Sequence, residues 1–146
     1  MIINILKLGI AAGGVISLLF AVFHLLFYRL FDCKSDFAKV SVRNSKIYYT
    51  VNFALILFFV IFGLISLAYA GELSSGAGLG AALTASYAFF WLWRSLWQVV
   101  YFEPSKSGNK GKKPYLHYLL IAISAVLFII YIAPMVVNIS GAVSTP

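Results

Sequence analysis

The chain has 146 residues, of which 62% are hydrophobic and only 10% are charged. A water-soluble domain usually carries about 25% charged residues, so this composition excludes one and indicates an integral membrane protein. The net charge of +7 does not indicate nucleic-acid binding, because the basic residues gather in two short polar stretches, as they do in the cytoplasmic loops of membrane proteins.

The first apolar run, residues 8–31, predicts a membrane-spanning helix. It is longer than the apolar core of a signal peptide and lacks a small-residue cleavage site, so we expect it to be retained. Small residues recur at four-residue steps and predict close approach of another helix: Gly9, Gly13, Ser17 and Ala21. His24 follows in the more polar, aromatic half of the run.

A polar stretch, residues 32–46, separates this run from a second predicted span, residues 47–70. The stretch holds four lysines and arginines and the only cysteine, Cys33, so neither an internal disulfide nor a paired-thiol redox site is possible. Asn52 is the only strongly polar side chain of the second span. Residues 71–80, rich in glycine and serine, predict a turn.

The third predicted span, residues 79–102, is the most unusual part of the chain. It begins with a second set of small residues, Gly78, Ala82 and Ser86, and continues into a segment rich in aromatic residues. One arginine and one glutamine interrupt that segment. The spacing i, i+4, i+7, i+11, i+14 places five residues on one helix face: Tyr87, Trp91, Arg94, Gln98 and Tyr101.

A second basic stretch, residues 103–114, leads to the fourth predicted span, residues 115–137. Pro134 should kink this helix near its far end. Positive charge is concentrated in residues 32–46 and 103–114, whereas the middle connection has none. The four apolar runs predict an all-α, single-domain protein of the cell (plasma or inner) membrane, with four helices in an up-down bundle. The positive-inside rule predicts that both basic stretches are cytoplasmic and both termini lie outside.

Arg94 is the leading candidate for a functional residue, because an ionisable group at membrane depth is costly. It lies eight residues before Phe102, or roughly 12 Å from the predicted end of the helix. The lean of helical side chains toward the amino end would carry it away from the cytoplasmic headgroups. We expect Arg94 to face the bundle interior, with snorkelling to the headgroups as the alternative.

The predicted orientation places His24, Asn52, Arg94 and His117 in the cytoplasmic half of the membrane. We therefore expect a polar recess that opens toward the cytoplasm. The more ordinary interpretation is that His24 is a neutral core histidine bonded to a neighbour and that Asn52 is a hydrogen-bonded link between helices. His117 is expected at the interface. Haem held by His24 and His117 is a weaker alternative, and no other cofactor is expected. A protein metal site is not expected, because two histidines fall short of the usual ligand sets.

Three functions remain open from the sequence. The first is a binding protein whose recess holds an anionic lipid or small anionic ligand through Arg94. The predicted site residues are Arg94, His24, Asn52, Trp91, Gln98 and Tyr87. The second is an assembly role through helix contacts with copies of itself or with another membrane protein. The third is a membrane enzyme or electron carrier using His24, although we find no catalytic signature.

Overall fold

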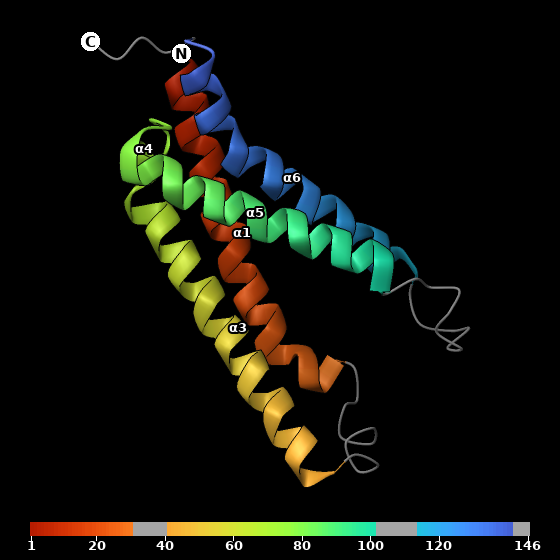
Figure 1. The fold of residues 1–146 in the computed structure, drawn as a ribbon. Coiled ribbons are helices and arrows are strands. Elements are labelled where there is room, and N and C mark those ends of the chain that lie inside the picture. Colours follow the sequence, from red (N-terminus) through yellow and green to blue (C-terminus); the bar gives the residue numbers. More distant parts are fainter. Residues whose placement is uncertain (31–40, 102–113, 142–146) are drawn as a thin grey trace. The chain divides into compact units, whose positions relative to one another are not determined.

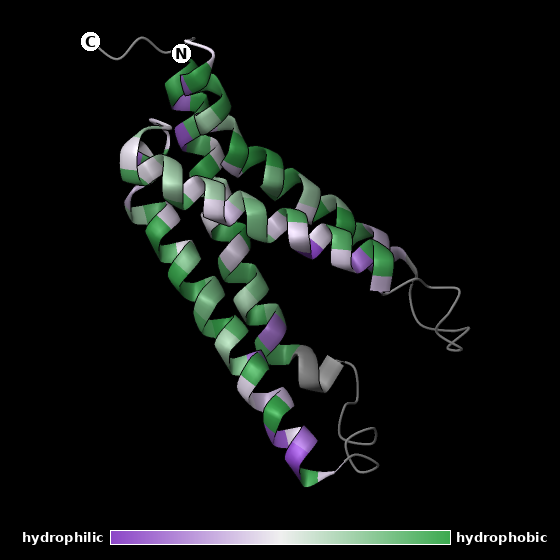
Figure 2. Ribbon diagram, viewed as in Figure 1, coloured by the Kyte–Doolittle hydropathy of each residue, from purple (hydrophilic) through white to green (hydrophobic). Residues whose placement is uncertain are grey.

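The computed structural model describes residues 1–30, 41–101 and 114–141, and over these ranges the chain is helical with no strand. Its long helices are α1 (Ile2–Leu30), α3 (Val42–Ala68), α5 (Gly78–Tyr101) and α6 (Pro114–Ile139), and a short α4 (Ala70–Leu73) precedes α5 (Figure 1). Within these described ranges, three segments are long and apolar enough to cross a membrane, namely Ile2–Leu26, Val42–Ala68 and Tyr115–Ile139 (Figure 2). The prediction of an all-α, multi-pass membrane protein is therefore confirmed at this level.

The helix α5 differs from the other three long helices. Its 24 residues give a length of about 36 Å, enough for the roughly 30 Å of a hydrocarbon core. It is not among the segments apolar enough to span by composition. The reason lies in its sequence, because Arg94, Gln98 and several hydroxyl residues lower the average hydropathy of the helix. A fourth span remains a prediction.

The helix boundaries depart from the predicted ones in two places. The helix α3 begins at Val42, so Arg43 and Lys46 belong to its first turns rather than to a loop. The cause is Ser41, whose hydroxyl accepts a hydrogen bond from the Asn44 N–H at 3.3 Å and caps the helix. The turn predicted over residues 71–80 contains part of α4, which buries Ala70 and Leu73. Cys33 and most of the two basic stretches lie outside the described residues.

The chain divides into two compact units, residues 11–69 and residues 1–10 with 70–146. We call them the α1–α3 unit and the α5–α6 unit. In the α1–α3 unit the helices are antiparallel (Figure 1), and two glycines lie where their backbones come close together. A Cβ atom built on Gly14 would lie 3.0 Å from the carbonyl oxygen of Gly63, and one on Gly63 would lie 3.0 Å from that of Gly14. Close approach of backbones is how membrane helices pack at small residues.

The first predicted stripe of small residues fits this packing with one difference. Gly13, Ser17 and Ala21 are buried, as the stripe requires. Gly14, which is not part of the predicted stripe, makes a tight contact within the α1–α3 unit.

In the α5–α6 unit, α5 and α6 lie side by side and run antiparallel (Figure 1). The turn before α5 is fastened to the far end of α6, where the Asn138 side-chain amide donates to the carbonyl oxygen of Ser75 at 3.1 Å. Gly76 adopts a φ of 63° beside the Pro134 carbonyl, a place where a side chain would clash. The second small stripe, Gly78, Ala82 and Ser86, lies on the exposed side of α5.

Candidate functional site

The predicted polar face of α5 is the face that packs inside the α5–α6 unit. Tyr87, Trp91 and Gln98 are buried and Arg94 is half-buried, whereas Tyr101 at the end of the helix is exposed. Tyr87 packs edge-on against Tyr131 of α6, with ring centroids 5.3 Å apart. Tyr87 and Trp91 lie on the same side of α5 as Arg94, so burial of these two aromatic side chains draws Arg94 inward.

Arg94 belongs to a three-residue network that joins α5 to α6. Its guanidinium donates to the side-chain oxygen of Gln98 at 2.5 Å, one helical turn away. The Gln98 amide nitrogen lies 3.1 Å from Nδ1 of His117 on α6. Because helical side chains lean toward the amino end, Gln98 reaches back over the turn that carries Arg94. Gln98 is only 6% exposed and holds the network together.

The chemistry of the three groups fixes the direction of each hydrogen bond. A guanidinium can only donate, so the oxygen of the Gln98 amide must face Arg94. The amide NH₂ then faces His117, so Nδ1 of His117 must accept and the ring proton resides on Nε2. Both ends of the network therefore present donors, the remaining N–H groups of Arg94 and the Nε2–H of His117. We call Arg94, Gln98 and His117 the donor network.

The register of the antiparallel pair explains why His117 joins this network. Gln98 lies three residues before the end of α5, and His117 lies three residues after the start of α6. Residues at equal distances from a connection between antiparallel helices lie opposite one another. Sequence reasoning placed His117 at the interface and missed its contact with Gln98, although counting outward from the basic stretch would have found the pair.

His24 and Asn52 form a second polar pair, within the α1–α3 unit. The Asn52 amide nitrogen donates to the backbone carbonyl of His24 at 3.2 Å, and its oxygen lies 3.0 Å from Nδ1 of His24. Since the backbone carbonyl only accepts, the Asn52 oxygen must face Nδ1, and His24 must carry its proton there. The imidazole packs against Phe59, with ring centroids 5.3 Å apart.

The six predicted site residues thus fall into two groups. Arg94 and Gln98 meet, with Tyr87 and Trp91 on the same buried face, and His24 meets Asn52. The two groups belong to different units, and their convergence into one recess remains a prediction. The two histidines hold opposite tautomers, with the proton on Nδ1 in His24 and on Nε2 in His117. Haem ligation by this pair also remains an alternative.

The arrangement on α5 and α6 suits the binding of an anion. Among the described residues, no cluster of three or more histidine, cysteine, aspartate or glutamate side chains could hold a metal ion. The helices α5 and α6 contain no aspartate or glutamate, so neither supplies a carboxylate to balance Arg94. Donors without a neighbouring carboxylate can take an acceptor-only ligand, such as a deprotonated oxyanion. In comparisons with known proteins, no family model, no curated protein and no solved structure matches this chain.

Proposed function

We propose that this chain is a four-span protein of the cell membrane that binds an oxyanion through the donor network of α5 and α6. In this proposal α5 is the third span, both basic stretches lie in the cytoplasm and both termini lie outside. The observation that carries the proposal is the direction of the network, which ends in hydrogen-bond donors at both Arg94 and His117.

The charge of Arg94 supports this proposal. An arginine at the membrane centre costs about 2.5–3.5 kcal/mol on insertion scales, and partners lower that cost. Gln98 satisfies one of the five guanidinium donors and contributes no negative charge. A bound oxyanion would supply both acceptors and charge. Guanidinium also binds phosphate and carboxylate through two parallel hydrogen bonds, which an ammonium group cannot reproduce.

The depth of the network supports the same proposal. Arg94 lies seven residues before Tyr101, the end of α5, which corresponds to about 10 Å along the axis. Gln98 and His117 each lie only three residues from the end of their helix. The network therefore extends from near the helix ends, where headgroups would lie, to a guanidinium at greater depth.

Binding can be tested by following the ¹⁵N NMR signal of the Arg94 guanidinium. The chain has three arginines, so replacing Arg29 and Arg43 by lysine leaves Arg94 as the only ¹⁵N-arginine signal. In neutral detergent we expect this signal to shift on addition of inorganic phosphate or of a short-chain phosphatidylglycerol. Gln98→Glu should suppress the shift, because an internal carboxylate would occupy the donors. No shift with either probe would contradict oxyanion binding.

One observation favours an assembly role as a second candidate function. The small-residue stripe of α5, Gly78, Ala82 and Ser86, lies on the exposed side of the helix. In membranes such stripes permit close approach of a further helix. A second copy of the chain or another membrane protein would cover this side of α5, and oligomer size distinguishes this function from ligand binding alone.

A further inference from the structure

We infer that the oxyanion is the phosphate of a phospholipid with net negative charge, which reaches Arg94 from the bilayer along an aromatic stripe on α5. This inference rests on the proposed oxyanion site and identifies the source of its ligand. The aromatic stripe consists of Trp93, Trp97 and Tyr101, which follow one another at four-residue steps.

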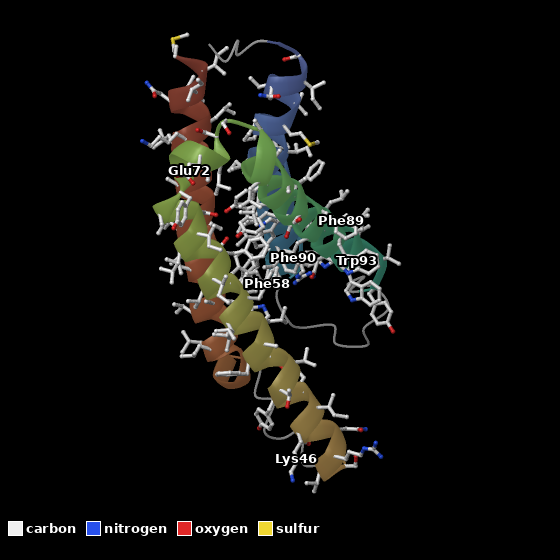
Figure 3. All side chains as sticks on the ribbon, turned by 60° about the vertical axis from the view of Figure 1, so that its left-hand side comes forward. Lys46, Phe58, Glu72, Phe89, Phe90 and Trp93 are labelled. Atoms are coloured by element: carbon white, nitrogen blue, oxygen red, sulfur yellow. The ribbon has the colours of Figure 1, made fainter. Side chains whose placement is uncertain are left out.

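The stripe is exposed and continuously stacked. The rings of Trp93 and Trp97 have centroids 5.5 Å apart, and those of Trp97 and Tyr101 lie 4.6 Å apart and nearly parallel, at 9°. Their side chains are 54%, 41% and 69% exposed. Figure 3 shows Trp93 on the half of α5 that leads to the helix end at Tyr101.

The position of the stripe relative to Arg94 is set by the helix itself. At 3.6 residues per turn, Trp97 lies about 60° around α5 from Arg94, and Gln98 lies about 40° around on the other side. Arg94 is thus at the border between the packed face and the aromatic stripe. Trp93 is its neighbour in the chain, so the stripe extends from the helix end to the depth of the guanidinium.

The side chains of tryptophan and tyrosine suit contact with a lipid whose headgroup lies deeper in the bilayer than those of its neighbours. Each has an apolar ring for acyl chains and a polar donor for ester and phosphate oxygens, which is why both residues collect at membrane interfaces. An aqueous phosphate would gain nothing from exposed indole rings. A phospholipid would keep its chains against the rings while its phosphate accepts from Arg94.

Charge complementarity selects a lipid with net negative charge. The helices α5 and α6 have no acidic residue, and the connection between them, residues 102–113, contains four lysines and one glutamate. Basic residues beside a membrane helix attract anionic lipids. A zwitterionic lipid would bring its own cationic group toward Arg94, where like charges repel.

Tryptophan fluorescence tests this inference, since all three tryptophans of the chain are on α5. The full chain is placed in phosphatidylcholine nanodiscs that contain an equal fraction of one lipid brominated high on its acyl chains. That lipid is either phosphatidylglycerol or phosphatidylcholine. We expect brominated phosphatidylglycerol to quench severalfold more strongly. Arg94→Gln should abolish this excess, whereas Lys7→Gln, which removes one exposed charge from α1, should preserve it.

The outcomes separate the lipid source from the site itself. An excess that needs Arg94 and is insensitive to added inorganic phosphate supports the inference. An excess that survives Arg94→Gln would assign the lipid preference to the lysines between the helices and overturn it. If the excess is absent while the ¹⁵N signal of Arg94 responds to inorganic phosphate, oxyanion binding stands but the source is aqueous, and the inference fails.

Discussion

At the scale of single residues, Gln98 is the side chain that links Arg94 to α6. It is buried, it contacts residues of both helices, and it satisfies one donor of Arg94 without neutralising the charge. A carboxylate in its place would form an internal ion pair, and an apolar residue would leave both neighbours without this link. A carboxylate at position 98 therefore tests the role of the positive charge of Arg94, and an apolar residue tests the role of the hydrogen bonds that Gln98 makes.

We predict that Gln98→Glu lowers the affinity for short-chain phosphatidylglycerol by about tenfold or more. Hydrogen bonds to charged groups contribute about 1.5–3 kcal/mol, and 1.4 kcal/mol corresponds to a factor of ten. Titration of the Arg94 ¹⁵N signal measures the change. Leu96→Ala, at an exposed position of the same helix, should leave the affinity unchanged. Unaltered binding by Gln98→Glu would show that the ligand does not depend on the donors of Arg94.

Substitution of Arg94 itself distinguishes its shape from its charge. We predict that Arg94→Lys weakens ligand binding, because an ammonium keeps the charge but loses the planar set of donors. Arg94→Leu should abolish binding while membrane insertion is retained or improved, since an apolar residue avoids the cost of a charge at depth. Mass spectrometry of co-purified lipid reports binding, and carbonate extraction reports insertion. Equal lipid retention by arginine and lysine would contradict a role for the guanidinium fork.

Sequence reasoning identified Arg94 and Gln98 and the face they share, because helical periodicity follows directly from spacing. The sequence alone did not, however, predict the contact of His117 with Gln98 or that of His24 with Asn52. Those contacts depend on the register between two helices, and a run of apolar residues carries little information about register. Gln98 and His117 lie at nearly equal numbers of residues from the basic stretch, and this spacing would have predicted their contact.

At the scale of the helices, the α1–α3 unit depends on two glycines. A methyl group on Gly14 would meet the Gly63 carbonyl oxygen at 3.0 Å, and one on Gly63 would lie 2.6 Å from Cγ of Leu18. We predict that Gly14→Ala and Gly63→Ala each destabilise the unit by about 1–3 kcal/mol, the usual cost of overpacking. Thermal unfolding in detergent measures this loss.

Gly71→Ala provides the matched control for this prediction. A methyl group there would meet no atom within 4 Å, so stability should not fall. If all three variants unfold at the same temperature, close packing at Gly14 and Gly63 does not limit stability. A methyl group on either glycine would meet one backbone carbonyl oxygen at 3.0 Å, so both substitutions should lower the unfolding temperature relative to Gly71→Ala.

The small stripe of α5 leads to a different expectation. Ala82 is exposed, so Ala82→Leu should leave the folded chain intact. If the assembly role operates, the same substitution should dissociate the oligomer, because a bulky side chain prevents close helix approach. Light scattering of the detergent complex measures the oligomer size. An unchanged oligomer would exclude this stripe as its interface.

At the scale of the whole molecule, the predicted topology follows from positive charge. The first basic stretch has four lysines and arginines and the second has four, whereas residues 71–80 have none. We predict that, in a Cys33→Ser background, an impermeant reagent applied from outside labels Ser75→Cys but not Asn109→Cys. Labelling of the second position alone would reverse the orientation, and labelling of neither or both would change the number of spans.

The all-helical, multi-pass character of the chain was predictable from composition, because 62% hydrophobic residues in runs longer than 20 cannot form a soluble surface. The number of spans was less predictable. The aromatic and polar residues of α5 lower its hydropathy, and they include Arg94 and Gln98 of the donor network and all three residues of the aromatic stripe. Hydropathy alone therefore does not indicate whether the helix that carries the candidate site crosses the membrane.

Contact between the Arg94 guanidinium and a lipid phosphate can be measured by solid-state NMR as a distance between ¹⁵N and ³¹P in bilayers. The sample is the variant in which Arg94 is the only arginine, in membranes containing phosphatidylglycerol. We expect strong dephasing of the Arg94 ¹⁵N signal by ³¹P, and loss of this effect in Gln98→Glu. An Arg94 signal that is undisturbed by phosphorus in anionic bilayers would exclude contact between Arg94 and a lipid phosphate.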